Sequence, residues 1–499
     1  MHLIGPIYLI IASLLAVYGL HALFLSLLYL RHRSERLTTP SLERTPLVTV
    51  QLPIYNEAHV VQRLIDAAAR LDYPSHRLQI QVLDDSTDET TSLAQARVAL
   101  HHSRGADITL LHRPERTGFK AGALAEGMKS ARGELIAIFD ADFLPPRDFL
   151  QRIVPHFQAC PRLGLIQARW AHLNAAYSAL TRAQALTLDG HFGVEQLARN
   201  RTGLFMNFNG TAGIWRRACI DDAGGWRGET ISEDMDLSYR AQLKGWEFLY
   251  LPHVQAPAEL PPQIQAFKRQ QFRWAKGATQ CLLRLGPRLL CAPIPLAQRI
   301  EGLLHLSGYL IHPLVLGLLL LSLPLLWADI HLRGPVAYLA LAGLGPLLLF
   351  TLGQQTLYRD WLRRLPGLPL VIVVGTGMAV NVTWAVVEAL LGRDSAFHRT
   401  PKFRVESSRD HWASSHYALP GDRITWAEMG AALYALMATG VAFARGAWGA
   451  IPFLLLYFAS FAYVAGLSLR HRRPQRSATS PQTPQPSRIA TTGSAPARR

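Results

Sequence analysis

Long apolar segments on both sides of a polar stretch constrain this chain more than any other feature. Residues 3–30 contain no Asp, Glu, Lys or Arg. As a helix they are long enough to cross the hydrocarbon core of a bilayer, which is about 30 Å thick. Further apolar segments lie at about 303–327, 335–357, 366–391, 426–443 and 447–469. We therefore expect a membrane protein whose polar stretch folds as a separate domain.

Basic residues decide the expected topology. The formal net charge is +16, and much of it lies beside apolar segments, at 31–36, 359–364 and 470–473. Such clusters favour the cytosolic side of a membrane, and no basic-aromatic stripe typical of nucleic-acid binding accompanies them. The expected partners therefore include a lipid bilayer and exclude nucleic acid.

The number of spans depends on one segment. If every apolar segment after residue 300 crossed the membrane, the basic loop 392–413 and the basic tail would lie outside, against the charge rule. If 366–391, which carries Asn381 and Glu388, is instead an interfacial or re-entrant helix, both lie inside. We expect five spanning helices, with a sixth span as the alternative.

The predicted organisation follows from these segments. It comprises an N-terminal transmembrane anchor (1–32), a cytosolic domain (45–262), amphipathic interfacial helices (263–299), two transmembrane helices (300–357), an interfacial or re-entrant helix (366–391), a cytosolic loop (392–423), two further transmembrane helices (424–470) and a tail (474–499). The tail is rich in Pro, Ser, Thr, Gln and Arg, a composition that predicts disorder.

The polar stretch alternates short β-branched runs with helical stretches, which predicts an α/β domain with a mixed, mostly parallel sheet. Ligands bind at the carboxyl ends of strands in such sheets. There is no Gly-x-Gly-x-x-Gly or Gly-Lys-Ser/Thr loop, so dinucleotide and P-loop sites are disfavoured. The strand-like runs are 48–52, 78–83, 108–111 and 134–139, and a helix is expected over 57–71.

Acidic pairs end two of these runs. Asp140 and Asp142 follow the fourth, where two carboxylates one residue apart can share one Mg²⁺ or Mn²⁺ ion that also binds a nucleotide diphosphate. A solvated strand-end turn is the alternative. Lys120, between Gly118 and Gly122, is a cation that can approach a pyrophosphate, unless it is an ordinary surface lysine.

Several segments together resemble the processive family-2 glycosyltransferases, which include cellulose, chitin and hyaluronan synthases. The subgroup that they most resemble is cellulose synthase-like A, the glucomannan 4-β-mannosyltransferases. The resemblance implies a GT-A type nucleotide-sugar-binding domain inserted between transmembrane α-helices. The segments are Gln51–Glu57, Leu83–Asp88, Gly118–Gly122, Asn209–Gly213, Ser232–Leu237 and Gln270–Trp274.

The resemblance implies contacts to the donor nucleotide-sugar. Asp84 and Asp85 would touch its base and ribose, although capping of the following helix by Asp85 or Ser86 is an alternative. Arg273 would meet the diphosphate together with Asp140. The residues that would frame the base are Pro53, Tyr55 and Glu57.

The catalytic and acceptor residues are implied in the same way. Inverting sugar transfer needs one base for the acceptor hydroxyl, and by similarity this is Asp234, with Glu233 beside it. Both would otherwise be acids that complement a helix dipole. The acceptor would meet Gly210, Trp246, Gln270 and Trp274, of which Gly210 has a tight turn and Trp246 ordinary packing as the alternative. Trp274 would stack on the terminal sugar or else anchor an interfacial helix.

A last segment, Phe397-His-Arg-Thr-Pro-Lys402, is similar to the gating loop of cellulose synthases. Phe397, Thr400 and Lys402 would close over the nucleotide, although Pro401 departs from the spacing. If the segment is that loop, it lies in the cytosol, in agreement with the charge argument.

The sequence as a whole predicts an inverting, metal-dependent β-glycosyltransferase that elongates a β-1,4-mannan, glucomannan or glucan from GDP-mannose or UDP-glucose. A non-processive transferase with a ceramide or polyprenyl-phosphate acceptor and a silent transport or scaffold subunit remain as alternatives. The Ala-, Leu- and Arg-rich composition indicates a bacterial inner membrane, with the Golgi as the alternative.

Overall fold

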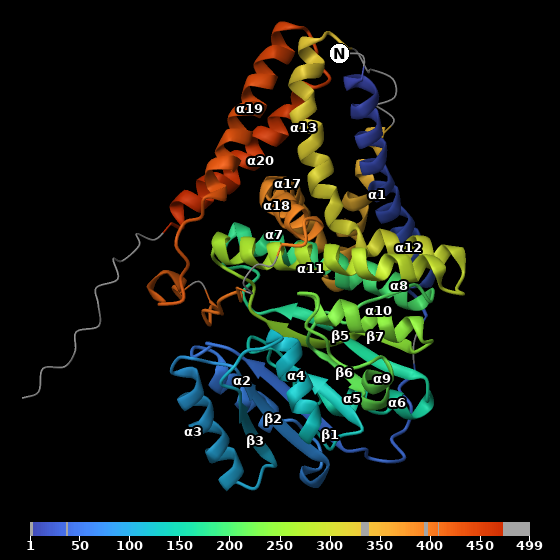
Figure 1. The fold of residues 1–499 in the computed structure, drawn as a ribbon, viewed down its shortest axis with the longest axis vertical. Coiled ribbons are helices and arrows are strands. Elements are labelled where there is room, and N and C mark those ends of the chain that lie inside the picture. The colour runs from blue at the N-terminus through green and yellow to red at the C-terminus, as the bar shows by residue number, and fades with distance from the viewer. Residues whose placement is uncertain (1–2, 36–37, 331–338, 394–397, 408, 473–499) are drawn as a thin grey trace, which may run out of the picture.

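The computed structural model describes residues 3–35, 38–330, 339–393, 398–407 and 409–472. Figure 1 shows an α/β domain at the bottom and a group of long helices above it. Three helices lie crosswise between the two parts. They are α7 (Ala179–Gly190), α11 (Ile264–Cys291) and α12 (Leu296–Leu306).

A seven-stranded sheet forms the centre of the α/β domain, with strand order β3-β2-β1-β4-β6-β5-β7. Only β6 runs antiparallel to its neighbours, which confirms the prediction of a mixed, mostly parallel sheet. The strands are β1 (Val48–Ile54), β2 (Leu78–Asp84), β3 (Ile108–His112), β4 (Leu135–Ile138), β5 (Leu163–His172), β6 (Gly213–Arg216) and β7 (Glu247–Ala258). The four predicted strands coincide with β1 to β4.

Strands β1 and β2 lie side by side between β3 and β4. Every residue of both strands is buried, as in parallel sheets that carry helices on both faces. The polar residues Gln51 and Gln81 are buried as well, and they pair with each other: Gln51 Nε2 donates a hydrogen bond to Gln81 Oε1 at 3.0 Å. These buried strands hold their carboxyl ends in fixed positions, where the acidic motifs begin.

The helices of the α/β domain are mostly short. The helix expected over 57–71 is shorter, because Asn56 adopts a left-handed conformation (φ 51°) and the turn extends to Val60. The helices are α2 (Val61–Ala69), α3 (Thr90–Ser103), α4 (Phe119–Ser130), α5 (Phe149–Ile153), α6 (His156–Ala159), α8 (Gln196–Arg201), α9 (Arg217–Asp222) and α10 (Glu233–Leu243). A π-helical turn, η2 (His191–Glu195), joins α7 to α8.

Among the described residues, four helices are long and apolar enough to cross a membrane. They are α1 (Ile4–His32), the helix at Gly308–Trp327 that contains α13 (Ile311–Trp327), α19 (Ile424–Ala444) and α20 (Ile451–Arg470). The predicted span 335–357 is described only in part, as a 3-10 turn followed by α15 (Leu344–Leu357). The short α16 (Trp361–Arg364) follows it.

The ambiguous segment 366–391 folds as two helices, α17 (Leu368–Gly377) and α18 (Ala379–Leu390). Residues 361–377 and 379–390 meet at an angle of 43°, which fits either a broken span or a re-entrant loop. Asn381 Nδ2 in α18 donates to the Lys268 carbonyl of α11 at 3.0 Å, so this polar residue faces another helix. The predicted disordered tail, 474–499, lies outside the described residues.

The membrane helices pack directly on the α/β domain. Leu25 and Tyr29 of α1 share a buried apolar cluster with Phe192 of η2, Tyr250 of β7 and Leu349 of α15. Helix α1 is therefore part of the hydrophobic core next to η2 and β7, and it is also long and apolar enough to span a membrane.

Candidate active site

A cavity of about 140 Å³ opens beside the carboxyl ends of β4 and β5. It collects residues from the sheet, from α4, α10 and α11, and from the loop after α18. Sequence analysis had selected ten of its lining residues: Lys120, Asp140, Asp142, Gly210, Glu233, Asp234, Gln270, Arg273, Trp274 and Lys402.

Each carboxylate of the Asp140–Asp142 pair is bound to a lysine. Lys120 Nζ donates to Asp140 Oδ1 at 2.5 Å, and Lys402 Nζ donates to Asp142 Oδ2 at 2.7 Å. The described residues contain no cluster of three or more His, Cys, Asp or Glu able to hold a metal alone. Two carboxylates do suit Mg²⁺ or Mn²⁺ when a substrate phosphate completes the ligand set, so the donor chemistry fits a shared cation.

Asp234 and Glu233 begin helix α10. Ser232 at the N-cap makes no side-chain capping bond. The two carboxylates lie in the first turn of the helix, where negative charges suit the helix dipole. Burial raises the pKa of Glu233 to about 7, with a further increase from Asp234 and a decrease from Lys120. Burial likewise raises the pKa of Asp234. A carboxylate with a raised pKa is a better proton acceptor near neutral pH.

Gly210 lies against the Asp234 carboxylate. Its φ of +81° favours glycine, and a Cβ at this position would come within 2.9 Å of Asp234 Oδ2. The Gly210 carbonyl also accepts a hydrogen bond from Lys120 Nζ at 2.8 Å. The tight turn and the functional role are thus compatible, because the turn lets the backbone reach both Lys120 and Asp234.

Helix α11 closes the membrane side of the cavity. Its residues Gln270, Arg273 and Trp274 all line it. Arg273 Nη2 donates to Thr400 Oγ1 at 3.0 Å, so the loop after α18 is held by the same helix. The side of α11 facing the Glu-Asp pair is tightly packed, because a Cβ at Gly277 would overlap Ser232.

The acidic pair that ends β2 is already engaged within the protein. Asp84 is fully buried and accepts hydrogen bonds from Thr91 Oγ1 at 2.7 Å and His112 Nδ1 at 2.9 Å. Asp85 accepts two bonds from Arg113, at 2.7 and 2.6 Å. Neither Asp85 nor Ser86 caps α3, whose N-cap residue is Glu89.

The predicted base-framing residues come off β1 next to this pair. The Arg116 guanidinium lies 3.5 Å from the centre of the Tyr55 ring. Glu57 lies 3.3 Å from Arg399, and burial raises the pKa of Glu57 to about 7 despite the opposing charge of Arg399. Pro53 lies within β1, paired with Leu83 of β2.

Trp246 is not brought to the cavity. Its indole Nε1 donates to Asp222 Oδ2 at 2.8 Å, and its ring packs against the buried cluster on the other face of the sheet. Packing, the alternative considered for this residue, accounts for its contacts. Phe397 lies outside the described residues; of the other two predicted loop residues, Lys402 lines the cavity and Thr400 contacts the lining residue Arg273.

The structure adds lining residues that the sequence analysis missed. Trp170 and His172 come from the end of β5, and Glu259 follows β7. The Trp170 ring centre lies 6.5 Å from that of Trp274. Glu259 accepts hydrogen bonds from the Phe403 and Arg404 N–H groups, at 3.0 and 2.8 Å. A polar residue after an apolar strand was the only signal for Glu259, and it is a weak one.

Comparisons with known proteins agree with this geometry. Residues 45–277 match the family described as glycosyltransferase like family 2. The chain is 48% identical over 236 residues to glucomannan 4-β-mannosyltransferase 2 of Arabidopsis thaliana, covering 46% of this chain and 44% of that protein. It is 46% identical over 236 residues to glucomannan 4-β-mannosyltransferase 1 of Oryza sativa subsp. japonica, covering 46% and 45%. The match therefore spans less than half of these relatives.

Among solved structures, the fold is similar to a mannosyltransferase from Pyrobaculum calidifontis in complex with GDP-Man and Mn²⁺. The TM-score is 0.52 at 22% identity, covering 78% of this chain and all of that one. This likeness supports the GT-A fold.

Proposed function

The chain belongs to glycosyltransferase family 2 through residues 45–277, and from this we propose that it is a membrane-embedded, inverting β-glycosyltransferase that elongates a polysaccharide. The product would be a β-1,4-linked mannan or glucomannan, or a glucan, with GDP-mannose or UDP-glucose as donor. One observation carries the proposal: the buried Asp234 carboxylate lines one cavity together with Asp140, Asp142 and Trp274.

In the proposed reaction Asp234 takes the proton of an acceptor hydroxyl, and that oxygen attacks the anomeric carbon of the donor sugar. The bond from the anomeric carbon to the nucleoside diphosphate breaks, and the diphosphate leaves with the electron pair. Lys120 of α4 and Arg273 of α11, which both line the cavity, offset its negative charge. A divalent cation held by Asp140 and Asp142 would supply further charge stabilisation when bound.

The loop after α18 is proposed to close over the donor. Lys402 bonds Asp142 and Thr400 bonds Arg273, so the loop touches both the proposed cation ligands and the proposed diphosphate ligand. Binding of a donor and a cation would replace these contacts. The loop would move away from the cavity after each sugar is added and would bind there again with the next donor.

The membrane part supports a multi-pass protein whose catalytic domain faces the cytosol. We propose five spans, with 366–391 as the non-spanning segment and 335–357 as one of the five, because the basic loop and tail then both lie inside. The growing polysaccharide would be the acceptor. The plant relatives give no support to a bacterial inner membrane.

The test is donor turnover by the full chain in lipid nanodiscs. GDP-mannose and UDP-glucose are compared with Mg²⁺, Mn²⁺ or chelator present, and the product is sized. A long β-1,4-linked polymer that disappears with chelator is expected. A lipid carrying a single sugar would overturn elongation in favour of the glycolipid reaction, and no metal-dependent turnover with any donor would favour a silent subunit.

A further inference from the structure

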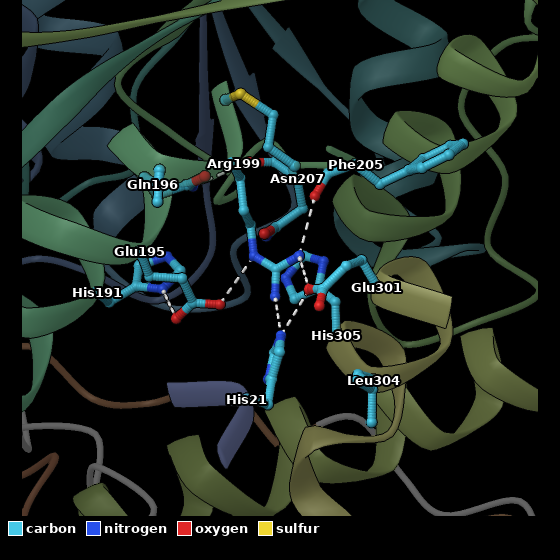
Figure 2. A network of polar contacts seen from close by, with 12 residues as sticks. His21, His191, Glu195, Gln196, Arg199, Phe205, Asn207, Glu301, Leu304 and His305 are labelled. Atoms are coloured by element: carbon cyan, nitrogen blue, oxygen red, sulfur yellow. Dashed lines mark hydrogen bonds and ion pairs between the residues drawn. The ribbon is translucent and has the colours of Figure 1, made fainter. Parts of the chain in front are cut away.

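A chain of polar side chains runs from the cavity to the membrane helix α1. It begins at Asn209, which lines the cavity. From there it passes through His191 and Glu195 of η2 to Arg199 of α8, which Figure 2 shows at the centre of the network. It ends at His21 of α1 and at Glu301 of α12. None of these side chains belongs to the reaction proposed above.

The hydrogen-bond partners of the Gln196 and Asn209 side-chain amides determine which of their atoms donate and which accept. Gln196 Nε2 contacts the Asn207 carbonyl at 3.3 Å, which can only accept. The atom of Asn209 that Gln196 Nε2 contacts at 2.7 Å is therefore the acceptor Oδ1. Asn209 thus presents its NH₂ group to His191 Nε2, at 3.2 Å.

The same logic assigns the histidine tautomer. Because Asn209 donates to Nε2, that nitrogen accepts, and the proton of a neutral imidazole lies on Nδ1. His191 Nδ1 then donates to Glu195 Oε2 at 3.0 Å. Burial opposes an ionised Glu195, but the hydrogen bond from His191 and the neighbouring positive charges hold the pKa of this carboxyl well below its usual value. The imidazole is thereby fixed between a carboxylate and an amide.

The far end of the chain is rigid. The Arg199 side chain is fully buried, its Nε donates to Glu195 Oε1 at 3.0 Å, and its Nη1 donates to the Phe205 carbonyl at 3.4 Å. His21 Nε2 lies 3.4 Å from Arg199 Nη2 and 2.7 Å from Glu301 Oε2. A buried guanidinium with partners on several elements cannot rotate without losing them, so Glu195 is held in place from behind.

Asn209 lines the same cavity as Trp170 and Trp274. An amide nitrogen carries two hydrogens, and the contact to His191 uses one. The other is available to a hydroxyl in the cavity. The next residue, Gly210, touches Asp234. A sugar hydroxyl bound by Asn209 would therefore lie near the proposed base.

We propose that His191 and Glu195 are positioning residues: they orient the Asn209 amide so that it donates to a hydroxyl of the acceptor's terminal sugar, and α1 holds this arrangement through Arg199. The inference rests on the proposed function. It makes the N-terminal membrane helix a support of the acceptor site and not only an anchor.

A matched pair of substitutions tests the assignment. In His191→Gln the terminal amide reaches about as far as Nε2 and can still accept from Asn209. In His191→Asn the amide ends about where Nδ1 lies, so it can reach Glu195 but not Asn209. Both variants carry a side-chain amide, and they differ in which neighbour this amide can reach, Asn209 or Glu195.

The full chain in nanodiscs is assayed with its donor and with β-1,4-linked oligosaccharides as acceptors, and the KM of each is measured. Donor hydrolysis without acceptor and melting temperature are measured as well. His191→Asn is expected to raise the acceptor KM about tenfold, with donor KM and donor hydrolysis unchanged. His191→Gln is expected to stay within about twofold of wild type, and Asn209→Ala to resemble His191→Asn.

Two failures are distinguishable. If wild type transfers no sugar to any oligosaccharide, the proposed function is overturned and this inference with it. If wild type elongates the oligosaccharide but the Asn and Gln variants have the same acceptor KM, or change donor and acceptor KM equally, this inference alone is overturned. Equal losses of melting temperature in both variants with unequal acceptor KM would support the positioning role.

Discussion

The two halves of the cavity differ in the charge and the interactions of the side chains that line them. On the proposed donor half, at the carboxyl end of β4, both carboxylates are paired with lysines: Asp140 with Lys120, and Asp142 with Lys402. On the proposed acceptor half, Trp170 and Trp274 lie near each other, and the neutral amide of Asn209 lines the same cavity.

This difference matches what each half would bind. A diphosphate and a cation carry opposite charges that can exchange partners with the existing ion pairs at little net cost in charge. A sugar has no charge, so an aromatic face and oriented hydrogen-bond donors serve it better. Asp234 and Gly210 lie at the boundary between the halves. The predictions below act first on this boundary and then on each half.

Asp234→Asn is expected to have the largest effect. It keeps the shape of the side chain but removes the base, so kcat for sugar transfer should fall by about 10²–10⁴, with donor KM nearly unchanged. Radiolabelled donor transfer measures it. A loss smaller than tenfold would mean that Asp234 is not the base and that the boundary between the halves holds no catalytic group.

Gly210→Ala is expected to lower kcat by about 100-fold, because the new Cβ would displace Asp234 from 2.9 Å contact. Gly105→Ala is the matched control: Gly105 also has a positive φ, of +88°, but a Cβ there meets nothing within 4 Å. The control should cost about 1 kcal/mol of stability and leave kcat unchanged. Equal activity losses in the two variants would mean that backbone strain, and not Asp234, is responsible.

The pH profile tests the charge state at the boundary. A general base works only when ionised, and burial raises the pKa of Asp234 and that of its neighbour Glu233, the latter to about 7. Activity should therefore rise with pH, with its acidic limb at a higher pH than an ordinary aspartate gives and a fall of about tenfold per pH unit below that limb. An acidic limb near pH 4, typical of an exposed carboxylate, would contradict the effect of burial.

Trp274→Ala probes the acceptor half. Loss of the aromatic face should raise the acceptor KM about tenfold, with donor KM unchanged. Trp274→Phe should recover most of that loss, since it keeps an aromatic surface. If donor KM rises instead, the division of the cavity into two halves is wrong.

Trp246→Phe is expected to have the smallest effect. The structure places this residue against Asp222, outside the cavity, so acceptor KM should change by no more than about twofold. Steady-state kinetics with oligosaccharide acceptors measures it. A larger change in acceptor KM with an unchanged melting temperature would extend the acceptor half to this end of β7.

Contiguous motifs could be predicted from the sequence because short-range geometry determines them. A buried apolar strand places the next residues at one edge of the sheet, so Asp140 and Asp142 could be assigned to the site before their contacts were known. Glu233 and Asp234, which begin a helix, were assigned by resemblance to the family-2 glycosyltransferases. The strand pattern likewise predicted β1 to β4. Trp246 was assigned to the acceptor by resemblance, with packing as the alternative, because nothing local distinguishes a tryptophan that packs from one that lines a cavity.

By itself, then, the sequence determined the α/β class of the domain, its place between apolar segments and the acidic groups at the strand ends, since burial periodicity and chain direction are local properties. Only the tertiary structure decided that Lys402 meets Asp142, that Asp84 is engaged by Thr91 and His112, and that His191 links Asn209 to α1. These contacts join residues that the fold brings together by packing helices against the sheet, and no local pattern in the chain specifies which distant partner each side chain meets.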